Sequence, residues 1–81
     1  MFEYTIDWGR CEITLNDYME KHNISKSRLS KMAEIQYSQL LAYCRNEIQR
    51  PDLGVLARIC RVLECDISDL LRYIPPDQDT L

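Results

Sequence analysis

The chain has 81 residues, of which 46% are hydrophobic and 28% are charged, and this is the composition of one small globular domain. Its net charge is −3, and it contains no run of about 18 apolar residues, which excludes a membrane-spanning helix. Residues 1–10 hold acidic side chains and no apolar run, so they do not resemble a secretory signal, and we expect a cytoplasmic protein.

The cysteines and the single histidine do not show the spacing of a metal site. Cys11, Cys44, Cys60 and Cys65 include no C-x-x-C pair, and His22 stands outside any ligand spacing. Without an export signal we expect no disulfides. We therefore interpret the thiols as small apolar side chains in or near the core, and we expect neither a metal nor a cofactor.

Charge is distributed unevenly along the chain. Residues 1–20 hold one basic and five acidic side chains, and residues 51–81 hold three and six, so both flanks are anionic. Residues 21–50 hold six basic and two acidic side chains, a net charge of +4. Because the local field decides which partner approaches a surface, this middle segment is suited to an anionic partner although the whole chain is acidic.

Residues 2–8 alternate apolar and polar side chains, with Phe2, Tyr4, Ile6 and Trp8 at the apolar positions. A period of two with aromatic and β-branched residues predicts a strand. Such a strand needs a partner, either a short C-terminal segment or the same strand of a second copy. Alternatively, the segment is an arm that lays its aromatic side chains on the helices. We expect Trp8 to anchor the core or a dimer.

A first helix of eight or nine residues is predicted after Thr14. Thr14 and Asp17 resemble a capping box in which Asp replaces the usual Glu or Gln. The inner face of the helix is the set of residues at helical spacing, namely Leu15, Tyr18, Met19 and His22. We interpret His22 as a packed or C-terminal helix residue and not as a catalytic base.

Two further helices are joined by a short link. Ser25 can cap a helix over 26–33, and the next helix covers about 36–45. Their inner faces are expected to consist of Leu29, Met32, Ala33, Leu40, Tyr43 and Cys44. Ile35 in the link is expected to fill the space between the helices. Two helices joined by about three residues at a steep angle form a helix-turn-helix.

Two more helices are predicted after residue 50. Pro51 stops the preceding helix and Asp52 caps a helix over 53–63. The apolar face of this helix is expected to consist of Leu53, Leu56, Ile59, Cys60 and Leu63. Asp66 and Asp69 predict the start of a short fifth helix that reaches about residue 73 and carries Ile67, Leu70 and Leu71 inward.

Two stretches, "ISKSRLSKMAEIQYSQLLAYCRN" and "RPDLGVLARICRVLECDISDLL", carry a resemblance to a known family. With them, residues 13–73 resemble the Cro/C1-type (xenobiotic-response-element, XRE) helix-turn-helix family of prokaryotic and phage transcriptional regulators. The resemblance implies an all-α, compact five-helix bundle of the lambda-repressor-like DNA-binding type. With the possible strand or arm over 1–12, we expect this helix-turn-helix domain over 13–74 and a loose tail over 75–81.

The resemblance also implies how double-stranded DNA would be bound. The helix over 26–33 would brace the phosphate backbone, and the helix over 36–45 would enter the major groove. The residues expected to contact bases are Gln36, Tyr37, Ser38, Gln39 and Ala42. The basic residues expected to contact the backbone are Lys26, Arg28, Lys31, Arg45 and Arg50. A Gln in this helix can pair with adenine through N6 and N7.

Three positions depart from the family pattern. Glu34 stands where the family favours Gly, so a left-handed backbone there would cost about 1 kcal/mol or more, and its carboxylate would repel phosphates. Ser30 replaces a usual Ala and is still small enough for the two helices to approach closely. Leu41 lies on or near a face that could be exposed, where it would contact thymine methyl groups or mark a protein-facing surface.

We therefore predict a sequence-specific DNA-binding transcriptional regulator that acts as a homodimer. The alternative is a protein-interaction module built on the same bundle, such as an antitoxin-like partner with weak or no DNA binding. We do not expect an enzyme, because the sequence has no glycine-rich phosphate loop and no paired catalytic carboxylates at a recognisable spacing. We expect neither a membrane nor a small-molecule substrate as a partner.

Overall fold

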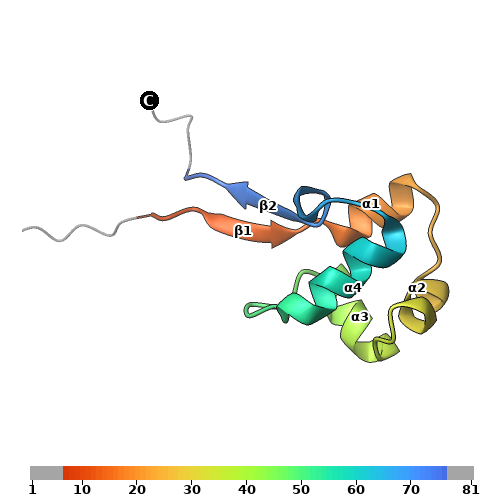
Figure 1. Cartoon of the computed structure of the whole chain (residues 1–81). Coiled ribbons are helices and arrows are strands. Elements are labelled where there is room, and N and C mark those ends of the chain that lie inside the picture. The colour runs from red at the N-terminus through yellow and green to blue at the C-terminus, as the bar shows by residue number, and fades with distance from the viewer. Residues whose placement is uncertain (1–6, 77–81) are drawn as a thin grey trace, which may run out of the picture.

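The computed structural model describes residues 7–76, which form four α-helices and a two-stranded sheet. In chain order the elements are β1 (Arg10–Ile13), α1 (Leu15–Lys21), α2 (Lys26–Met32), α3 (Tyr37–Cys44), α4 (Leu53–Leu63), the 3₁₀ turn η1 (Ile67–Asp69) and β2 (Leu71–Ile74). The helices form one body, and the strands form a ribbon that projects from it (Figure 1). None of the helices in this part of the chain is long and apolar enough to cross a membrane.

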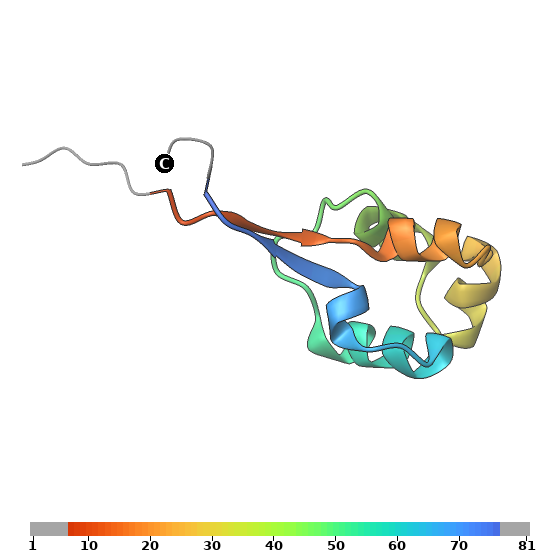
Figure 2. The same cartoon turned by 90° about the horizontal axis from the view of Figure 1, so that it is seen from above.

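The ribbon joins the two ends of the described chain. β1 and β2 pair antiparallel, with Arg10 opposite Ile74 and Ile13 opposite Leu71. Thr14 N–H continues the pairing where the ribbon meets the helices, donating to the Leu70 carbonyl at 2.7 Å. Figure 2 shows the two strands side by side along the length of the ribbon. Of the partners considered for an N-terminal strand, the short C-terminal segment is therefore the one that pairs with β1.

The predicted position of the N-terminal strand differs from the observed one. Residues 2–6 lie outside the described residues, and the observed strand starts at Arg10, directly after Gly9 with a φ of +77°. Trp8 is 76% exposed, so the expectation that it anchors the core is wrong. Cys11 on β1 is also exposed and does not lie in or near the core as expected.

The predicted fifth helix is wrong. Asp66 and Asp69 form a reciprocal capping box, but it starts only the short turn η1. Ser68 donates from its N–H and its hydroxyl to Asp66, and these bonds lower the pKa of that carboxyl group. The chain then extends, because the backbone of residues 71–74 pairs with β1. The domain is therefore mostly helical with a small sheet, and the all-α, five-helix expectation is corrected to four helices.

One core lies between the helices and the base of the ribbon. It contains the twelve buried apolar residues Ile13, Leu15, Met19, Leu29, Ala33, Ile35, Leu40, Tyr43, Val55, Leu56, Ile59 and Leu70. The helices that carry them have nearly the predicted bounds. Ile35 is 4% exposed, which confirms that it fills the space next to the link between α2 and α3.

Four predicted inner positions are instead exposed. Met32 and Leu53, 58% and 77% exposed, stand at the last residue of α2 and the first residue of α4. Since helical side chains lean toward the helix N-terminus, Leu53 extends past the packed part of α4. Ile67 in η1 is 44% exposed. His22 is exposed after the end of α1, where its ring centroid lies 4.2 Å from that of Tyr18.

Two of the three predicted helix caps are present. Ser25 Oγ accepts a hydrogen bond from Arg28 N–H at 3.3 Å, and Asp52 Oδ1 accepts one from Gly54 N–H at 2.7 Å. The capping box at Thr14 is wrong, because Thr14 makes no side-chain bond to α1. Its hydroxyl instead donates to the Asp69 carbonyl at 3.0 Å and ties the start of α1 to η1.

Each helix is followed, one or two positions after its last residue, by a non-glycine residue with a left-handed backbone. These residues are Asn23, Glu34, Asn46 and Glu64, with φ between +53° and +59°. At the end of α2, Glu34 N–H donates to the Lys31 carbonyl and Ile35 N–H to the Ser30 carbonyl, the two bonds of a Schellman motif. The left-handed turn considered for Glu34 is therefore present, without the Gly that would adopt it more easily.

We predict that Leu40→Ala lowers the free energy of unfolding by about 2–5 kcal/mol, because it empties a fully buried site between α2 and α3. The matched control is Leu53→Ala, which removes the same atoms from an exposed site and should change stability by less than about 0.5 kcal/mol. Urea unfolding of both variants tests this. Equal losses in the two would contradict the described core.

We predict that Glu34→Gly raises the free energy of unfolding by about 0.5–1 kcal/mol, because relief of the left-handed strain exceeds the added entropy of the unfolded chain. Glu20→Gly, in the right-handed last turn of α1, is the control and should lower the free energy of unfolding by up to about 1 kcal/mol. Chemical unfolding at one pH measures both. A loss at residue 34 as large as that at residue 20 would exclude the left-handed turn.

Candidate nucleic-acid interface

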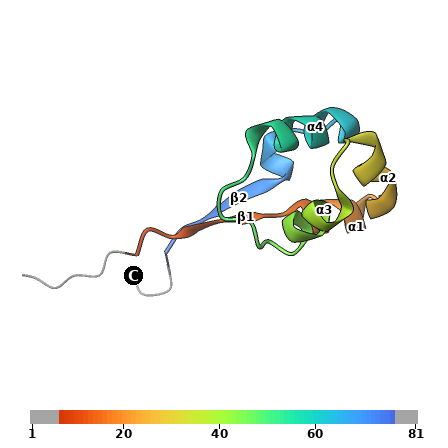
Figure 3. The same ribbon diagram turned by 90° about the horizontal axis from the view of Figure 1, so that it is seen from below.

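The N-cap and first turn of α3 carry four uncharged hydrogen-bonding side chains on the surface. Gln36, Tyr37, Ser38 and Gln39 are all exposed, and within residues 7–76 none of these side chains makes a hydrogen bond. Ala42, one turn further, is half-buried. α3 lies at the lower edge of the helical body in Figure 1, and Figure 3 shows it from below, in front of α1. The groups are thus free to bind an external partner.

The outward direction of Ser38 follows from the position of the core. Leu40 and Tyr43 are buried, and with 3.6 residues per turn the opposite side of α3 is formed by Ser38, Ala42 and Arg45. α3 has no charged residue from Gln36 to Cys44. Its outward side therefore combines small and uncharged groups with one cation at its C-terminal end.

Basic side chains lie on the elements before and after this helix. The five that the sequence singled out lie on α2 and after α3: Lys26 is half-buried, and Arg28, Lys31, Arg45 and Arg50 are exposed. Within residues 7–76 the ion pairs join Arg10 and Arg72 to Glu12 on the ribbon, so none of the five is neutralised by a described carboxylate. Glu34, in the turn between α2 and α3, is exposed and brings one negative charge to this side.

The loop that carries Arg50 is fixed at both ends by hydrogen bonds to side chains. The Tyr43 hydroxyl accepts a bond from Asp52 N–H at 2.9 Å, and Asn46 Oδ1 accepts one from Ile13 N–H at 2.8 Å. Tyr43 is 2% exposed, so a buried side chain of α3 binds the N-cap residue of α4. The position of the loop relative to α3 is therefore determined by the fold.

The turn between α2 and α3 is held by a residue that sequence reasoning missed. Arg58 on α4 donates from Nε to the carbonyl of Ala33 at 2.8 Å, and so satisfies an acceptor at the C-terminus of α2. The positive charge also interacts favourably with that helix end. A basic residue on the outer face of a predicted helix gives no signal for such a contact, because the partner is a backbone atom 25 positions away.

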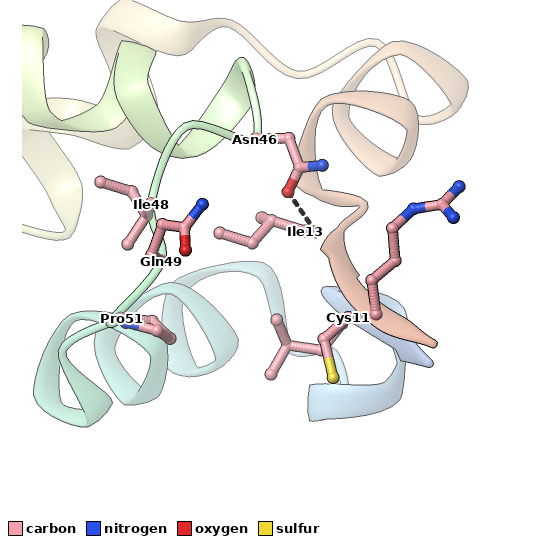
Figure 4. A pocket seen from close by; sticks show the side chains of 8 residues that line it. Cys11, Ile13, Asn46, Ile48, Gln49 and Pro51 are labelled. Carbon is pink, nitrogen blue, oxygen red and sulfur yellow. Dashed lines mark hydrogen bonds between the residues drawn. The ribbon is translucent and has the colours of Figure 1, made fainter. Parts of the chain in front are cut away.

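A hollow of about 370 Å³ lies between the ribbon and the loop after α3 (Figure 4). It is lined by Arg10, Cys11, Ile13, Asn46, Ile48, Gln49, Pro51 and Leu71. The hydrogen bond from Ile13 N–H to Asn46 joins two of these lining residues. Its lining holds one charged side chain and no carboxylate, so it contains no acid–base pair for catalysis.

The thiols and acidic groups give no metal site in the described part of the chain. No group of three or more His, Cys, Asp or Glu side chains there could hold a metal ion. Cys44, Cys60 and Cys65 are half-buried. Burial raises the pKa of the Cys65 thiol to about 11, and the neighbouring Cys60 contributes in the same direction.

We predict that iodoacetamide at pH 8 modifies Cys11 first and Cys65 last. Cys11 is exposed, whereas Cys65 stays protonated well above pH 8, and a thiol reacts as its thiolate. Mass spectrometry of peptides from the native protein gives the order, and the same reaction in denaturant should remove the difference. Modification of native Cys65 as fast as Cys11 would contradict the described packing.

Comparison with known proteins gave one finding. A family model described as "Cro/C1-type HTH DNA-binding domain" matches residues 14–76, which is most of the chain. The resemblance recognised in the sequence is thereby confirmed. Searches of curated proteins and of solved structures gave no match.

Proposed function

Because this chain belongs to the Cro/C1-type HTH DNA-binding domain family, we propose that it is a sequence-specific transcriptional regulator in which α2 braces the DNA backbone and α3 reads the major groove. The family implies DNA binding and is typically non-enzymatic. The observation that supports this use of the helices is the exposed, uncharged first turn of α3 next to unpaired cations.

The side chains of α3 supply the direct contacts in this proposal. Gln36 and Gln39 each offer an amide that can bond both N6 and N7 of adenine, and such a pair discriminates against a wrong base by roughly 1–3 kcal/mol. Ser38 can bond any base, and Tyr37 can reach a sugar, a phosphate or a thymine methyl group. Ala42 lies next along the same face and allows close approach to the groove floor.

The basic side chains supply affinity that does not depend on sequence. Lys26, Arg28 and Lys31 on α2 would contact phosphates on one side of α3, and Arg45 and Arg50 on the other. Because neutralised phosphates release counterions, the logarithm of the binding constant should fall with the logarithm of salt concentration, with a slope of about −0.9 per phosphate contacted. Glu34 opposes this attraction, so we expect net affinity to be lower than five cations alone would give.

We propose that the active species is a homodimer. A two-fold axis would place two copies of α3 in successive major grooves, about 34 Å apart, and the operator would be a palindrome. Two exposed aromatic side chains support this proposal: Trp8, just before β1, is 76% exposed, and Tyr73 on β2 is 56% exposed. Large exposed aromatic side chains are typical of interfaces.

Selection from a pool of random duplexes tests the proposed function. We expect an enriched palindrome whose binding weakens steeply between two salt concentrations. Weak binding without an enriched sequence, at either salt concentration, would contradict it and support a protein-interaction module on the same bundle.

We predict that Ser38→Ala combined with Gln39→Ala reduces the ratio of selected to random duplex binding by at least about tenfold, because one bidentate pair is lost. Both side chains are exposed, so the melting temperature should stay within a few degrees. The control is His22→Ala, which changes an exposed polar residue next to α1. This variant should show the same ratio of selected to random duplex binding as the parent protein. Fluorescence anisotropy with both duplexes measures the ratio, and an unchanged ratio in the double variant would exclude the groove assignment.

A further inference from the structure

Leu41 has an apolar side chain that is not part of the described core. It is half-buried, yet in the described chain it belongs neither to the twelve core residues nor to the partly buried residues that pack against them. On α3 it follows Ser38 by one turn and precedes Arg45 by one turn, so it shares their side of the helix. α3 thus carries apolar side chains on more than one face, with Leu40 and Tyr43 buried inward and Leu41 on the side of Ser38 and Arg45.

The chemistry of the outward residues fits one type of base pair. Specific contacts to guanine are made most often by Arg or Lys, and contacts to the cytosine amino group by Asp or Glu. None of these residue types occurs from Gln36 to Cys44. Glutamine amides bind adenine, and apolar side chains contact the 5-methyl group of thymine, which projects into the major groove.

We infer that the half-site read by α3 consists mainly of A·T pairs, and that the 5-methyl group of one thymine packs against Leu41. This inference rests on the proposed function and makes Leu41 a specificity-determining residue. Gln36 and Gln39 bind adenine, and Leu41, on the side of α3 that carries Ser38 and Arg45, supplies the apolar surface that the methyl group covers. Arg45 stands beyond the last turn of α3 and binds a phosphate.

Replacement of single thymines by deoxyuridine tests the inference, because it removes the methyl group and leaves base pairing intact. The probe is the duplex recovered by selection, with each thymine replaced in turn. At one position per half-site we expect the dissociation constant to rise about fourfold, the factor that corresponds to about 0.8 kcal/mol for one buried methyl-sized group. Replacements outside the half-sites are the internal control and should bind as the parent duplex does.

Two variants connect the methyl group to Leu41. Leu41→Ser should bind the thymine duplex about fourfold more weakly per half-site, and it should no longer distinguish deoxyuridine from thymine at the sensitive position. Leu41→Met keeps an apolar side chain of similar volume and should retain the distinction. Melting temperatures within a few degrees of the parent show that both variants are folded, since Leu41 is not a core residue.

The outcomes separate this inference from the function on which it rests. An enriched half-site of G·C pairs would overturn the inference and leave the regulator intact. The same holds for an A·T half-site whose deoxyuridine versions all bind like the parent, or for a methyl effect that survives Leu41→Ser. Binding without an enriched sequence would contradict the proposed function, and the inference with it.

Discussion

The relative orientation of α2 and α3 depends on one tight reversal at Glu34 and Ile35. Both backbone groups of Ile35 are bonded to Ser30: its N–H donates to the Ser30 carbonyl at 3.0 Å, and its carbonyl accepts from the Ser30 hydroxyl at 2.6 Å. Arg58 holds the adjacent carbonyl of Ala33 from α4. Because this turn satisfies its own polar groups, Ile35 can be buried without cost in lost hydrogen bonds, and the first turn of α3 is left on the surface.

Positive and negative charges are distributed differently on the two parts of the molecule, the ribbon and the side that carries α2 and α3. The ribbon neutralises much of its own charge, since Glu12 pairs with both Arg10 and Arg72. The side that carries α2 and α3 keeps its cations unpaired within the described residues, although the whole chain has a net charge of −3. A polyanion would therefore be attracted most strongly to the side that carries α2 and α3.

The sequence allowed the helices to be predicted closely because strong apolar periodicity and the caps Ser25 and Asp52 act over a few residues. It did not allow the ribbon to be placed. β1 and β2 pair residues some sixty positions apart, and local patterns contain no information on such a partner. Met32 and Leu53 have the spacing of core residues but are exposed, because periodicity does not indicate at which residue a helix loses contact with the core. The exposed side chains at the start of α3 could be predicted from the sequence. The hydrogen bond from Arg58 to the Ala33 carbonyl could not, because it joins residues that only the fold brings together.

The most direct test of the whole account is to titrate a selected duplex into isotope-labelled protein and follow the backbone amide resonances. Binding through α2 and α3 predicts the largest shifts at the start of α2 and along residues 36–45, with small shifts on the ribbon at residues 10–13 and 71–74. Large shifts confined to the ribbon and α4, with α3 unaffected, would show that another surface binds DNA and would contradict it.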